Sequence, residues 1–493
     1  MKEQSKLSKV LSILLSVVLV ISSFYLLYQV IRLNVLPSKF LFPLTIGVVV
    51  LDAIFILLLI YFSKNVVSKI VCIVLTLFIC VASCMGGYYI SKTQNVLSSI
   101  TNVAKHAKNT VSVIVKESSS IKNKSQLNGV SVGSLRLNEQ GSKKALKELS
   151  GEGIVLNQKE YDSMTALLEA FYNGEVDSII INESSRSQIL DMETYSNFDS
   201  NTRVVYQTSY KVKNNDSATS VSDITSKPFN VLISGSDTRG GFDENGRSDV
   251  IMIATVNPKT HTILLTSVPR DFYVTTACDA GDGCMQGALD KITHTGIHGT
   301  NTTKRTVEQL LGIEINYTFK VGFDTVTELV DVLGGVDVYV EPGYATTTSE
   351  FSVHEGVNHL NAQQALAFAR ERYSYTEGDR QRTKNQQQVL MGIVKEVTKP
   401  SVITNYAAIM DTMANTFSTT MSNAEITDLI KYQLNNNPTW KMEQYMVDGT
   451  GDTLMCAELG DAASVMVPDQ STVKMAKDKI NAVLAGKSSE DVK

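Results

Sequence analysis

Carboxylate and guanidinium groups recur at the ends of three consecutive apolar runs in this 493-residue chain. The runs N-V-L-I-S, V-I-M-I-A-T-V and T-I-L-L-T-S-V are rich in β-branched residues, which is typical of buried strands. The turn from Asn257 to Thr260, with a looser hairpin over residues 240–246, predicts that these strands run up, down and up. One edge of the sheet should then carry the charged residues Asp237, Arg239, Arg247, Asp249, Arg270 and Asp271.

Such a cluster suits the binding of phosphate groups together with a divalent cation. Carboxylates hold hard cations such as Mg²⁺, and a guanidinium group grips two phosphate oxygens at once. A surface salt-bridge patch would contribute only about 0–1 kcal/mol and would not require six charges at the ends of adjacent strands. The pattern therefore favours a binding site over a purely structural patch.

A second charged segment reads F-A-R-E-R-Y-S-Y-T-E-G-D-R-Q-R-T-K-N-Q-Q. Arg370 and Arg372 are two residues apart, so they share a face only if the chain leaves the helix that starts near Asn361 in an extended conformation. Arg382 and Gln386 are four residues apart and form one polar row on a helix that begins near Arg382. That helix is expected to bury Val389, Leu390, Ile393 and Val397 and to expose Arg380, Lys384 and Gln387.

Residues 228 to about 480 resemble the LytR-CpsA-Psr family of wall-glycopolymer ligases. The resemblance rests on seven motifs in order: S-G-S-D-T-R, R-S-D-V-I-M-I, S-V-P-R-D, D-K-I-T-H-T-G, L-G-G-V-D-V-Y-V, A-R-E-R-Y and G-D…R…Q-Q. It implies that Mg²⁺, with Mn²⁺ as an alternative, binds Asp237 and Asp249. It also implies pyrophosphate contacts from Arg247, Arg270, Arg370, Arg372, Arg382 and Gln386. The chain departs from the family pattern at Arg380 and Gln381, where an aromatic residue and a glycine are common.

The resemblance implies a phosphotransferase that moves a glycopolymer, expected to be capsular polysaccharide, from a polyprenyl-pyrophosphate carrier to peptidoglycan. Arg270 would stabilise the charge that develops on the phosphates, and Asp249 or Asp271 would accept the proton of the attacking hydroxyl. Two alternatives stay open. The same site could hydrolyse the pyrophosphate with water, or the protein could be a non-catalytic regulator of wall polymer assembly.

Three apolar runs are each long enough to cross about 30 Å of hydrocarbon as a helix. They cover residues 10–31, 40–62 and 70–90. Because Lys2, Lys6 and Lys9 precede the first run, the N-terminus is expected in the cytoplasm and the chain from about residue 92 outside the cell membrane. Asp52 would be costly in contact with lipid, so it should face the neighbouring helices.

The overall expectation is an α/β protein with a membrane anchor. Strand-like stretches near Val111, Val130, Ile154, Val176 and Arg203 alternate with helical patterns over residues 142–149 and 163–172, which predicts a small α/β accessory domain. The catalytic domain should be a mixed central sheet flanked by helices. The expected parts are an anchor (1–92), the accessory domain (95–213), a polar linker (214–227), the catalytic domain (228–480) and a polar tail (481–493).

Charge and cysteine usage agree with an exported, membrane-bound protein. The net charge of −5 and the lack of a basic stretch argue against nucleic acid as a partner. The family resemblance implies the lipid-linked polymer, peptidoglycan and capsule assembly proteins as partners, and the apolar runs imply the bilayer. Cys278 and Cys284 bracket a glycine-containing loop where a disulfide can form and persist, and Cys456 is left unpaired. His294 and His298 lack a further zinc ligand at a suitable spacing.

Overall fold

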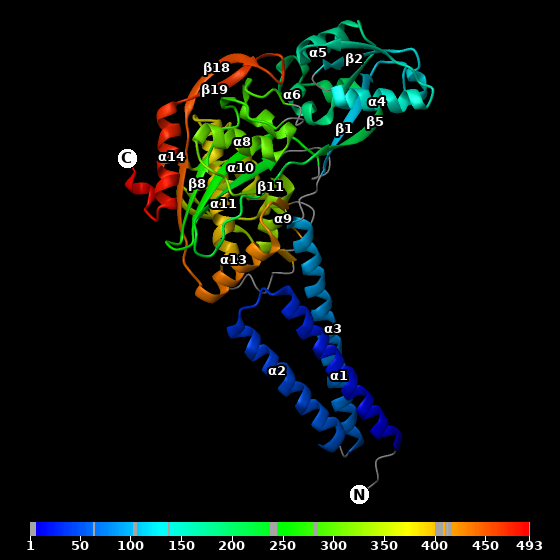
Figure 1. Ribbon diagram of the computed structural model, residues 1–493, viewed down its shortest axis with the longest axis vertical. Coiled ribbons are helices and arrows are strands. Elements are labelled where there is room, and N and C mark those ends of the chain that lie inside the picture. The colour runs from blue at the N-terminus through cyan, green and yellow to red at the C-terminus, as the bar shows by residue number, and fades with distance from the viewer. Residues whose placement is uncertain are drawn as a thin grey trace. The chain divides into compact units, whose positions relative to one another are not determined.

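The computed structural model describes residues 6–62, 65–101, 106–136, 139–236, 244–279, 284–399, 408–409, 412 and 417–492. The chain divides into two compact units. The first consists of Met1–Thr101, Val397–Ala414 and Ser422–Thr439, and the second of Asn102–Glu396, Asn415–Met421 and Trp440–Lys493. Figure 1 labels helices and strands of both units where there is room.

The first unit contains three helices that are long and apolar enough to cross a membrane, as the sequence predicted. They are α1 (Lys6–Leu33), α2 (Ser38–Leu57) with the π-helical turn η1 (Leu58–Phe62), and α3 (Val66–Thr101). The third helix continues well past residue 90. Asp52 on α2 accepts a hydrogen bond from Ser23 of α1 at 2.9 Å, so this carboxyl faces a neighbouring helix as expected. The unit also contains α13 (Asn423–Asn436), which begins with a capping box between Ser422 and Glu425.

The accessory domain is a five-stranded sheet between two helices. Its strands are β1 (His106–Lys116), β2 (Ser131–Leu135), β3 (Asn157–Tyr161), β4 (Ser178–Asn182) and β5 (Thr202–Lys213), in the order β3-β2-β4-β1-β5. Ile179 and Ile181 of β4 pack with α5 (Met164–Asn173), while Ile180 packs with α4 (Glu139–Gly151). Alternate side chains of one strand thus bury both faces of the sheet. Shorter helices are η2 (Lys124–Leu127), η4 (Glu183–Ser185), α6 (Arg186–Asp191), η5 (Glu193–Tyr195) and α7 (Phe198–Asn201).

One predicted strand of this domain was misplaced. The apolar run at Ile154 is not a strand but the exit from α4, where the amide of Ile154 donates to the carbonyl of Leu149 at 2.9 Å. The strand follows at Asn157–Tyr161, which is polar and largely exposed because it pairs only with β2 at the edge of the sheet. An edge strand needs few apolar side chains, so its sequence gave no hydrophobic signal.

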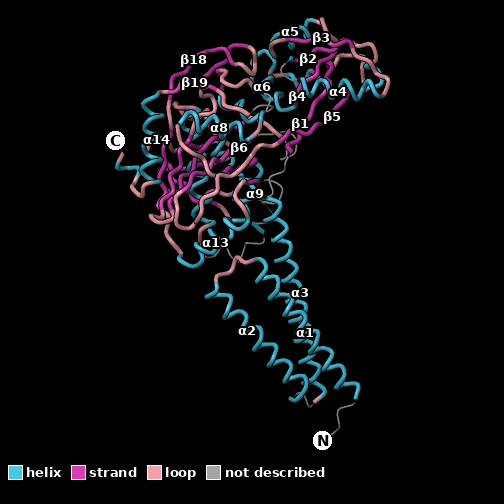
Figure 2. The backbone as a smooth tube through the Cα atoms, viewed as in Figure 1, coloured by secondary structure: helices cyan, strands magenta, loops and turns pink. Residues whose placement is uncertain are grey.

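The domain expected from the sequence to be catalytic, called the catalytic domain below, is built on a six-stranded mixed sheet, which confirms the expected α/β class (Figure 2). The strands are β6 (Phe229–Ser236), β7 (Ser248–Asn257), β8 (Thr262–Ser267), β11 (Tyr317–Gly322), β16 (Phe417–Thr419) and β17 (Lys441–Met446), in the order β16-β11-β6-β7-β8-β17. β6, β7 and β8 pair antiparallel, as predicted, while β11 and β17 add parallel to β6 and β8. Asn257 closes the predicted turn by accepting from the amides of Lys259 and Thr260.

Helices flank this sheet. Apolar residues of β7 and β8 form one core with α8 (Thr300–Leu311) and α14 (Gln470–Leu484). The other main helices are α9 (Phe323–Leu333), α10 (Ala362–Arg370) and α11 (Asp379–Val397). The remaining elements are β9 (Tyr273–Thr275), β10 (Leu289–Lys291), η6 (Ile292–His298), β12 (Val336–Val340), β13 (Thr346–Thr347), β14 (Ser352–Val353), β15 (Gly356–Leu360), β18 (Gly449–Cys456), β19 (Asp461–Pro468) and η7 (Ser489–Asp491).

The segments expected as a polar linker and a polar tail are both fastened to the catalytic domain. Within residues 214–227, the amide of Thr219 donates to the carbonyl of Asn316 at 2.8 Å, and that of Val221 donates to the hydroxyl of Tyr317 at 3.1 Å. Within residues 481–493, Val483 is fully buried and the amide of Ser489 donates to Glu443 at 2.8 Å. Polar composition therefore did not mean a free segment here.

A disulfide joins Cys278 and Cys284, as predicted, with a Cα–Cα distance of 6.4 Å. It closes a short loop between β9 and β10. Cys456 is a free cysteine and is fully buried at the end of β18.

Gly296 gives a direct test of how η6 supports the start of β7. A Cβ atom at this position would lie 2.5 Å from the carbonyl oxygen of Gly246 and 2.5 Å from the amide nitrogen of Ser248. Because these are backbone atoms, we expect Gly296→Ala to displace the segment before Asp249 and to lower the free energy of unfolding by about 1–3 kcal/mol. Thermal unfolding of the full-length protein in detergent measures the loss. Gly451→Ala is the control, since no atom lies within 4 Å of its Cβ, and equal stability of the two variants would contradict this expectation.

Candidate functional site

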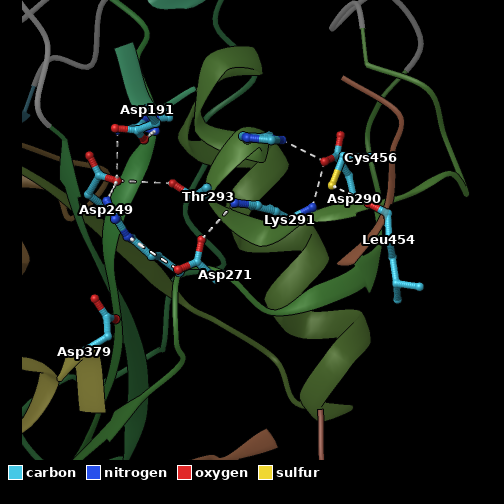
Figure 3. A network of polar contacts seen from close by, with 12 residues as sticks. Asp191, Asp249, Asp271, Asp290, Lys291, Thr293, Asp379, Leu454 and Cys456 are labelled. Carbon is cyan, nitrogen blue, oxygen red and sulfur yellow. Dashed lines mark hydrogen bonds and ion pairs between the residues drawn. The ribbon is translucent and has the colours of Figure 1, made fainter. Parts of the chain in front are cut away.

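Charged side chains from separate strand ends meet around Asp249, the second residue of β7 (Figure 3). Its Oδ1 atom accepts a hydrogen bond from Nη1 of Arg270 at 2.8 Å, and Nη2 of Arg247 lies 3.8 Å from the same oxygen. The hydroxyl of Thr293 donates to this oxygen at 3.4 Å. The Asp249 side chain is only 9% exposed, and these guanidinium groups offset the cost of burying it.

The second charged segment, at the start of α11, lies beside Asp249 and Arg270. One small pocket is lined by Asp249, Arg270, Asp379, Arg382 and Gln386, together with apolar residues of β7. Residues that are more than 100 positions apart in the sequence therefore share one space because α11 lies against the sheet. Arg382 forms an ion pair with Asp379 one turn earlier, at the start of the helix.

The pocket is lined by two arginines and two aspartates, and its two arginines have pKa values shifted in opposite directions. Burial lowers the pKa of Arg382, and the charges of Arg270 and Arg372 lower it further, although Asp379 acts in the opposite direction. Burial also acts to lower the pKa of Arg270, but the carboxylates of Asp249 and Asp271 outweigh it, so that pKa is raised. The two arginines differ because Arg270 has two close carboxylates.

Three buried guanidinium groups keep a donor that receives no acceptor from the described residues. These donors are the Nε–H groups of Arg247, Arg270 and Arg382. A buried donor without a partner costs roughly 1–3 kcal/mol, so such groups are uncommon unless a ligand completes them. Three of them around one carboxylate are suited to an anion with several oxygens.

Arg370 and Arg372 lie where α10 ends. The helix starts after the capping residue Asn361 and stops at Arg370, and Glu371 is extended, as the sequence predicted. Arg372 donates from Nη2 to the hydroxyl of Tyr373 at 2.6 Å and stacks 4.7 Å from its ring centre. Arg372 is close enough to affect the pKa of Arg382, whereas Arg370 does not line the pocket.

The D-K-I-T-H-T-G motif supports the site from one side. The buried carboxylate of Asp290 contacts Nδ1 of His294 at 2.7 Å and accepts from the amide of Glu458 at 2.7 Å. These bonds fix the neighbouring Lys291, whose Nζ atom lies 3.3 Å from Asp271 (Figure 3). The histidine therefore has a structural role, and the described residues contain no group of three or more metal-ligating side chains.

Of the two magnesium ligands expected from the sequence, Asp249 lies within the described residues. Asp237 and Arg239 lie outside the described residues. For Asp249, every contact from the described part of the chain falls on Oδ1, so Oδ2 keeps its full capacity to accept. Mg²⁺ is usually held by one or two carboxylates together with substrate phosphates rather than by a protein cage, and a carboxylate oxygen of this kind fits that chemistry.

Several expectations for α11 were wrong. The helix begins at Asp379 rather than near Arg382, and its first-turn carboxylate faces the arginines of the pocket. Gln387, expected on a solvated face, is buried and donates from Nε2 to the carbonyl of Tyr445 at 2.8 Å. Lys384 is not simply solvated either, because it lies 3.4 Å from Glu341. A polar side chain facing the backbone of a sheet cannot be told from an exposed one by helical periodicity.

Residues that the sequence did not assign to the site are Asp379, Thr293 and Asp191. Asp379 had a usable signal, because it follows a glycine in a motif that also carries Arg382. Thr293 lies in the recognised D-K-I-T-H-T-G motif. Asp191 had no signal, since it belongs to α6 of the accessory domain and forms an ion pair with Arg247.

Comparison with known proteins identifies the family. The profile of the LytR-CpsA-Psr family matches residues 194–482, which is more than half of the chain. The chain belongs to the LytR-CpsA-Psr family. The family match includes the whole six-stranded sheet and every described residue that lines the pocket.

Among curated relatives, this family member is similar to polyisoprenyl-teichoic acid–peptidoglycan teichoic acid transferases named TagU. The Bacillus cereus (strain AH820) protein is 33% identical over 207 residues, covering 42% of this chain and 65% of the relative. The Bacillus subtilis (strain 168) protein is 35% identical over 196 residues, covering 40% of this chain and 60% of the relative. The chain thus spans less than two thirds of the length of these two relatives. A crystal structure of B. subtilis TagU aligns with 52% of this chain and 97% of that chain at 28% identity, with a TM-score of 0.40.

The unsatisfied arginines of this LytR-CpsA-Psr protein predict stabilisation by a polyvalent anion. Inorganic pyrophosphate that binds the folded pocket should raise the melting temperature of the full-length protein in detergent by about 2 °C or more at saturating concentration. Differential scanning fluorimetry measures the shift. Arg382→Ala should reduce it, while Lys474→Ala, which removes a largely exposed lysine elsewhere, should not. An equal shift with sodium chloride at matched ionic strength would show that no specific site is involved.

Proposed function

We propose that this protein is a membrane-anchored phosphotransferase that moves a glycopolymer from a polyprenyl-pyrophosphate carrier to peptidoglycan. The observation that carries the proposal is the pocket in which Asp249, Arg270, Asp379 and Arg382 meet, with three buried guanidinium Nε–H groups left to donate. Membership of the LytR-CpsA-Psr family and the names of the TagU relatives support transfer of a lipid-linked polymer.

The arginines bind the pyrophosphate of the donor. Arg247, Arg270 and Arg382 donate to non-bridging phosphate oxygens from Nε–H groups that make no hydrogen bond to the described residues, and Gln386 adds a neutral contact. Nε of Arg270 also lies 3.8 Å from Asp271. Arg370 and Arg372 contribute from the end of α10. These charges are fixed before the reaction, so they stabilise the developing charge on the leaving phosphate without reorganisation of solvent.

The chemical step is a displacement at phosphorus. A hydroxyl of peptidoglycan bonds to the phosphorus that carries the glycan, and the bond from that phosphorus to the bridging oxygen breaks. Polyprenyl phosphate leaves with the electron pair. The hydroxyl proton passes to Asp271, whose side chain is 33% exposed and can release the proton to water. Nζ of Lys291 lies 3.3 Å from Oδ1 of Asp271, and Nε of Arg270 lies 3.8 Å from its Oδ2.

Magnesium remains part of the proposal. Asp237 and Asp249, the two ligands expected from the sequence, would hold Mg²⁺ or Mn²⁺ together with donor phosphates. When bound, the ion supplies positive charge beside the phosphates. Without the ion, Arg247, Arg270 and Arg382 still bind and orient the pyrophosphate.

The proposal extends to the identity of the donor polymer and to the side of the membrane on which the domains lie. Capsular polysaccharide is the donor expected from the sequence, and teichoic acid, named in the TagU relatives, is the competing donor. With the N-terminus in the cytoplasm, the accessory and catalytic domains lie outside the membrane, where peptidoglycan is found.

The orientation can be tested with protease added to intact protoplasts. We expect digestion of the residues after α3, since they lie outside the membrane, and protection of the fragment that contains the three spans. An antibody to an N-terminal tag follows the protected fragment. Full protection of the catalytic domain, with digestion only after lysis, would place it in the cytoplasm and reject a wall-facing enzyme.

Substitutions in the pocket test the chemistry. Asp249→Asn should lower transfer of a lipid-linked saccharide to peptidoglycan at least about 100-fold, and Arg270→Lys at least about tenfold, because lysine keeps the charge but loses the planar fork. Arg136→Lys, a matched change at an exposed arginine of the accessory domain, should leave transfer unchanged. Product analysis by mass spectrometry of purified peptidoglycan gives the result.

The same assay distinguishes transfer from the other functions considered. Release of polyprenyl phosphate without saccharide on peptidoglycan would favour a hydrolase. Binding of the donor without release of either product would favour a non-catalytic receptor. Near-normal transfer by folded Asp249→Asn would remove that carboxylate and its metal from the mechanism.

A further inference from the structure

The accessory domain touches the candidate site through one carboxylate. Asp191, the last residue of α6, forms an ion pair with Nη1 of Arg247 (Figure 3). The Arg247 side chain is 11% exposed, whereas that of Asp191 is 56% exposed. The carboxylate thus reaches from the solvent-facing side to a buried guanidinium group.

The helix that carries Asp191 is firmly held within its own domain. Arg186, in the first turn of α6, pairs with Glu183 through Nε at 2.5 Å and Nη2 at 2.8 Å. Its Nη1 atom donates to Asp199 at 2.9 Å. Ile189 of the same helix is fully buried in the domain core. Asp191 is therefore presented from a fixed backbone rather than from a loose loop.

The domain is also fixed against the β18-β19 hairpin of the catalytic domain. The amide of Met164 donates to the carbonyl of Leu459 at 2.9 Å. Met192, next to Asp191, packs against the buried cluster of Cys456, Leu459 and Val465. These contacts set the distance at which Asp191 meets its arginine.

The accessory domain makes a further contact with the segment that precedes β7, through Glu244. Glu244 is buried, accepts a hydrogen bond from the hydroxyl of Thr110 on β1, and lies 3.4 Å from Nζ of Lys108. Glu244 precedes Arg247 by three residues. The described residues 244–247, which lead into β7 and Asp249, are thus held at both ends by the accessory domain.

We propose that Asp191 is a positioning residue for Arg247, so that the accessory domain completes the donor site. Asp191 binds Nη1 and leaves Nε–H of Arg247 to donate to the donor pyrophosphate. Among the described residues, the carboxylate that stays near Arg247 without Asp191 is Asp249, which lies 3.8 Å away and is already bonded to Arg270. Arg247 would then turn toward Asp249, and both groups would leave the arrangement that the donor needs.

This inference rests on the proposed function and can be tested separately from it. The full-length protein in detergent is compared with Asp191→Ala, Asp191→Glu and the control Glu193→Ala, which removes an exposed carboxylate two residues away. The probe for binding is geranylgeranyl diphosphate, and the probe for turnover is the lipid-linked saccharide. Because Asp191 is exposed, the melting temperature should change by less than about 3 °C.

For Asp191→Ala we expect a rise of about fivefold in the Kd of geranylgeranyl diphosphate and in the KM of the donor, with kcat changed less than about twofold. Asp191→Glu should restore most of the affinity because it returns the carboxylate. In an Arg247→Ala background, Asp191→Ala should have no further effect, because its partner is already gone.

Three results would overturn the inference: unchanged Kd and KM for Asp191→Ala, the same loss in the Arg247→Ala background, or tighter binding by Asp191→Ala. The last result would mean that Asp191 competes with the donor for Arg247. If the wild-type protein transfers no saccharide but loses affinity for geranylgeranyl diphosphate on Asp191→Ala, the positioning role stands and the proposed function fails.

Discussion

Crowding of positive charge at one edge of a sheet is the constraint on which the site depends. Arg247 and Arg270 both approach a single oxygen of Asp249, and Arg382 is brought to the same pocket by α11. Like charges at this spacing repel one another most strongly where water is excluded. The fold holds them by giving each arginine a carboxylate from a different element: Asp249 from β7, Asp379 from α11 and Asp191 from α6.

Because these carboxylates come from different elements, several helices and strands are needed to form one small pocket. β7 and β8 supply the central pair, α11 brings Arg382 and Asp379 together, and the Asp290 network keeps Lys291 beside Asp271. Each ion pair is partly buried, so removing one partner would leave the other without compensation. The site is therefore a joint product of several elements, and no one loop contains it.

The sequence predicted what depends on local pattern. The strand order β6-β7-β8, the Asn361 helix start and the convergence of strand-end charges follow from periodicity and turn chemistry. It missed what depends on packing. Gln387 is buried because α11 lies against backbone carbonyls, and Asp191 reaches Arg247 only because two domains are docked. Neighbouring residues in the sequence give no sign of the burial of Gln387 or of the Asp191–Arg247 ion pair.

The buried Cys456 has a consequence for how this protein acquires its disulfide. Burial raises the pKa of its thiol to about 12, and the nearby carboxylate of Asp290 adds to the effect. At neutral pH this burial favours the unreactive protonated thiol, which disfavours exchange with the Cys278–Cys284 bond once the hairpin has closed. Packing of β18 and β19 therefore withdraws Cys456 from competition for Cys278 and Cys284.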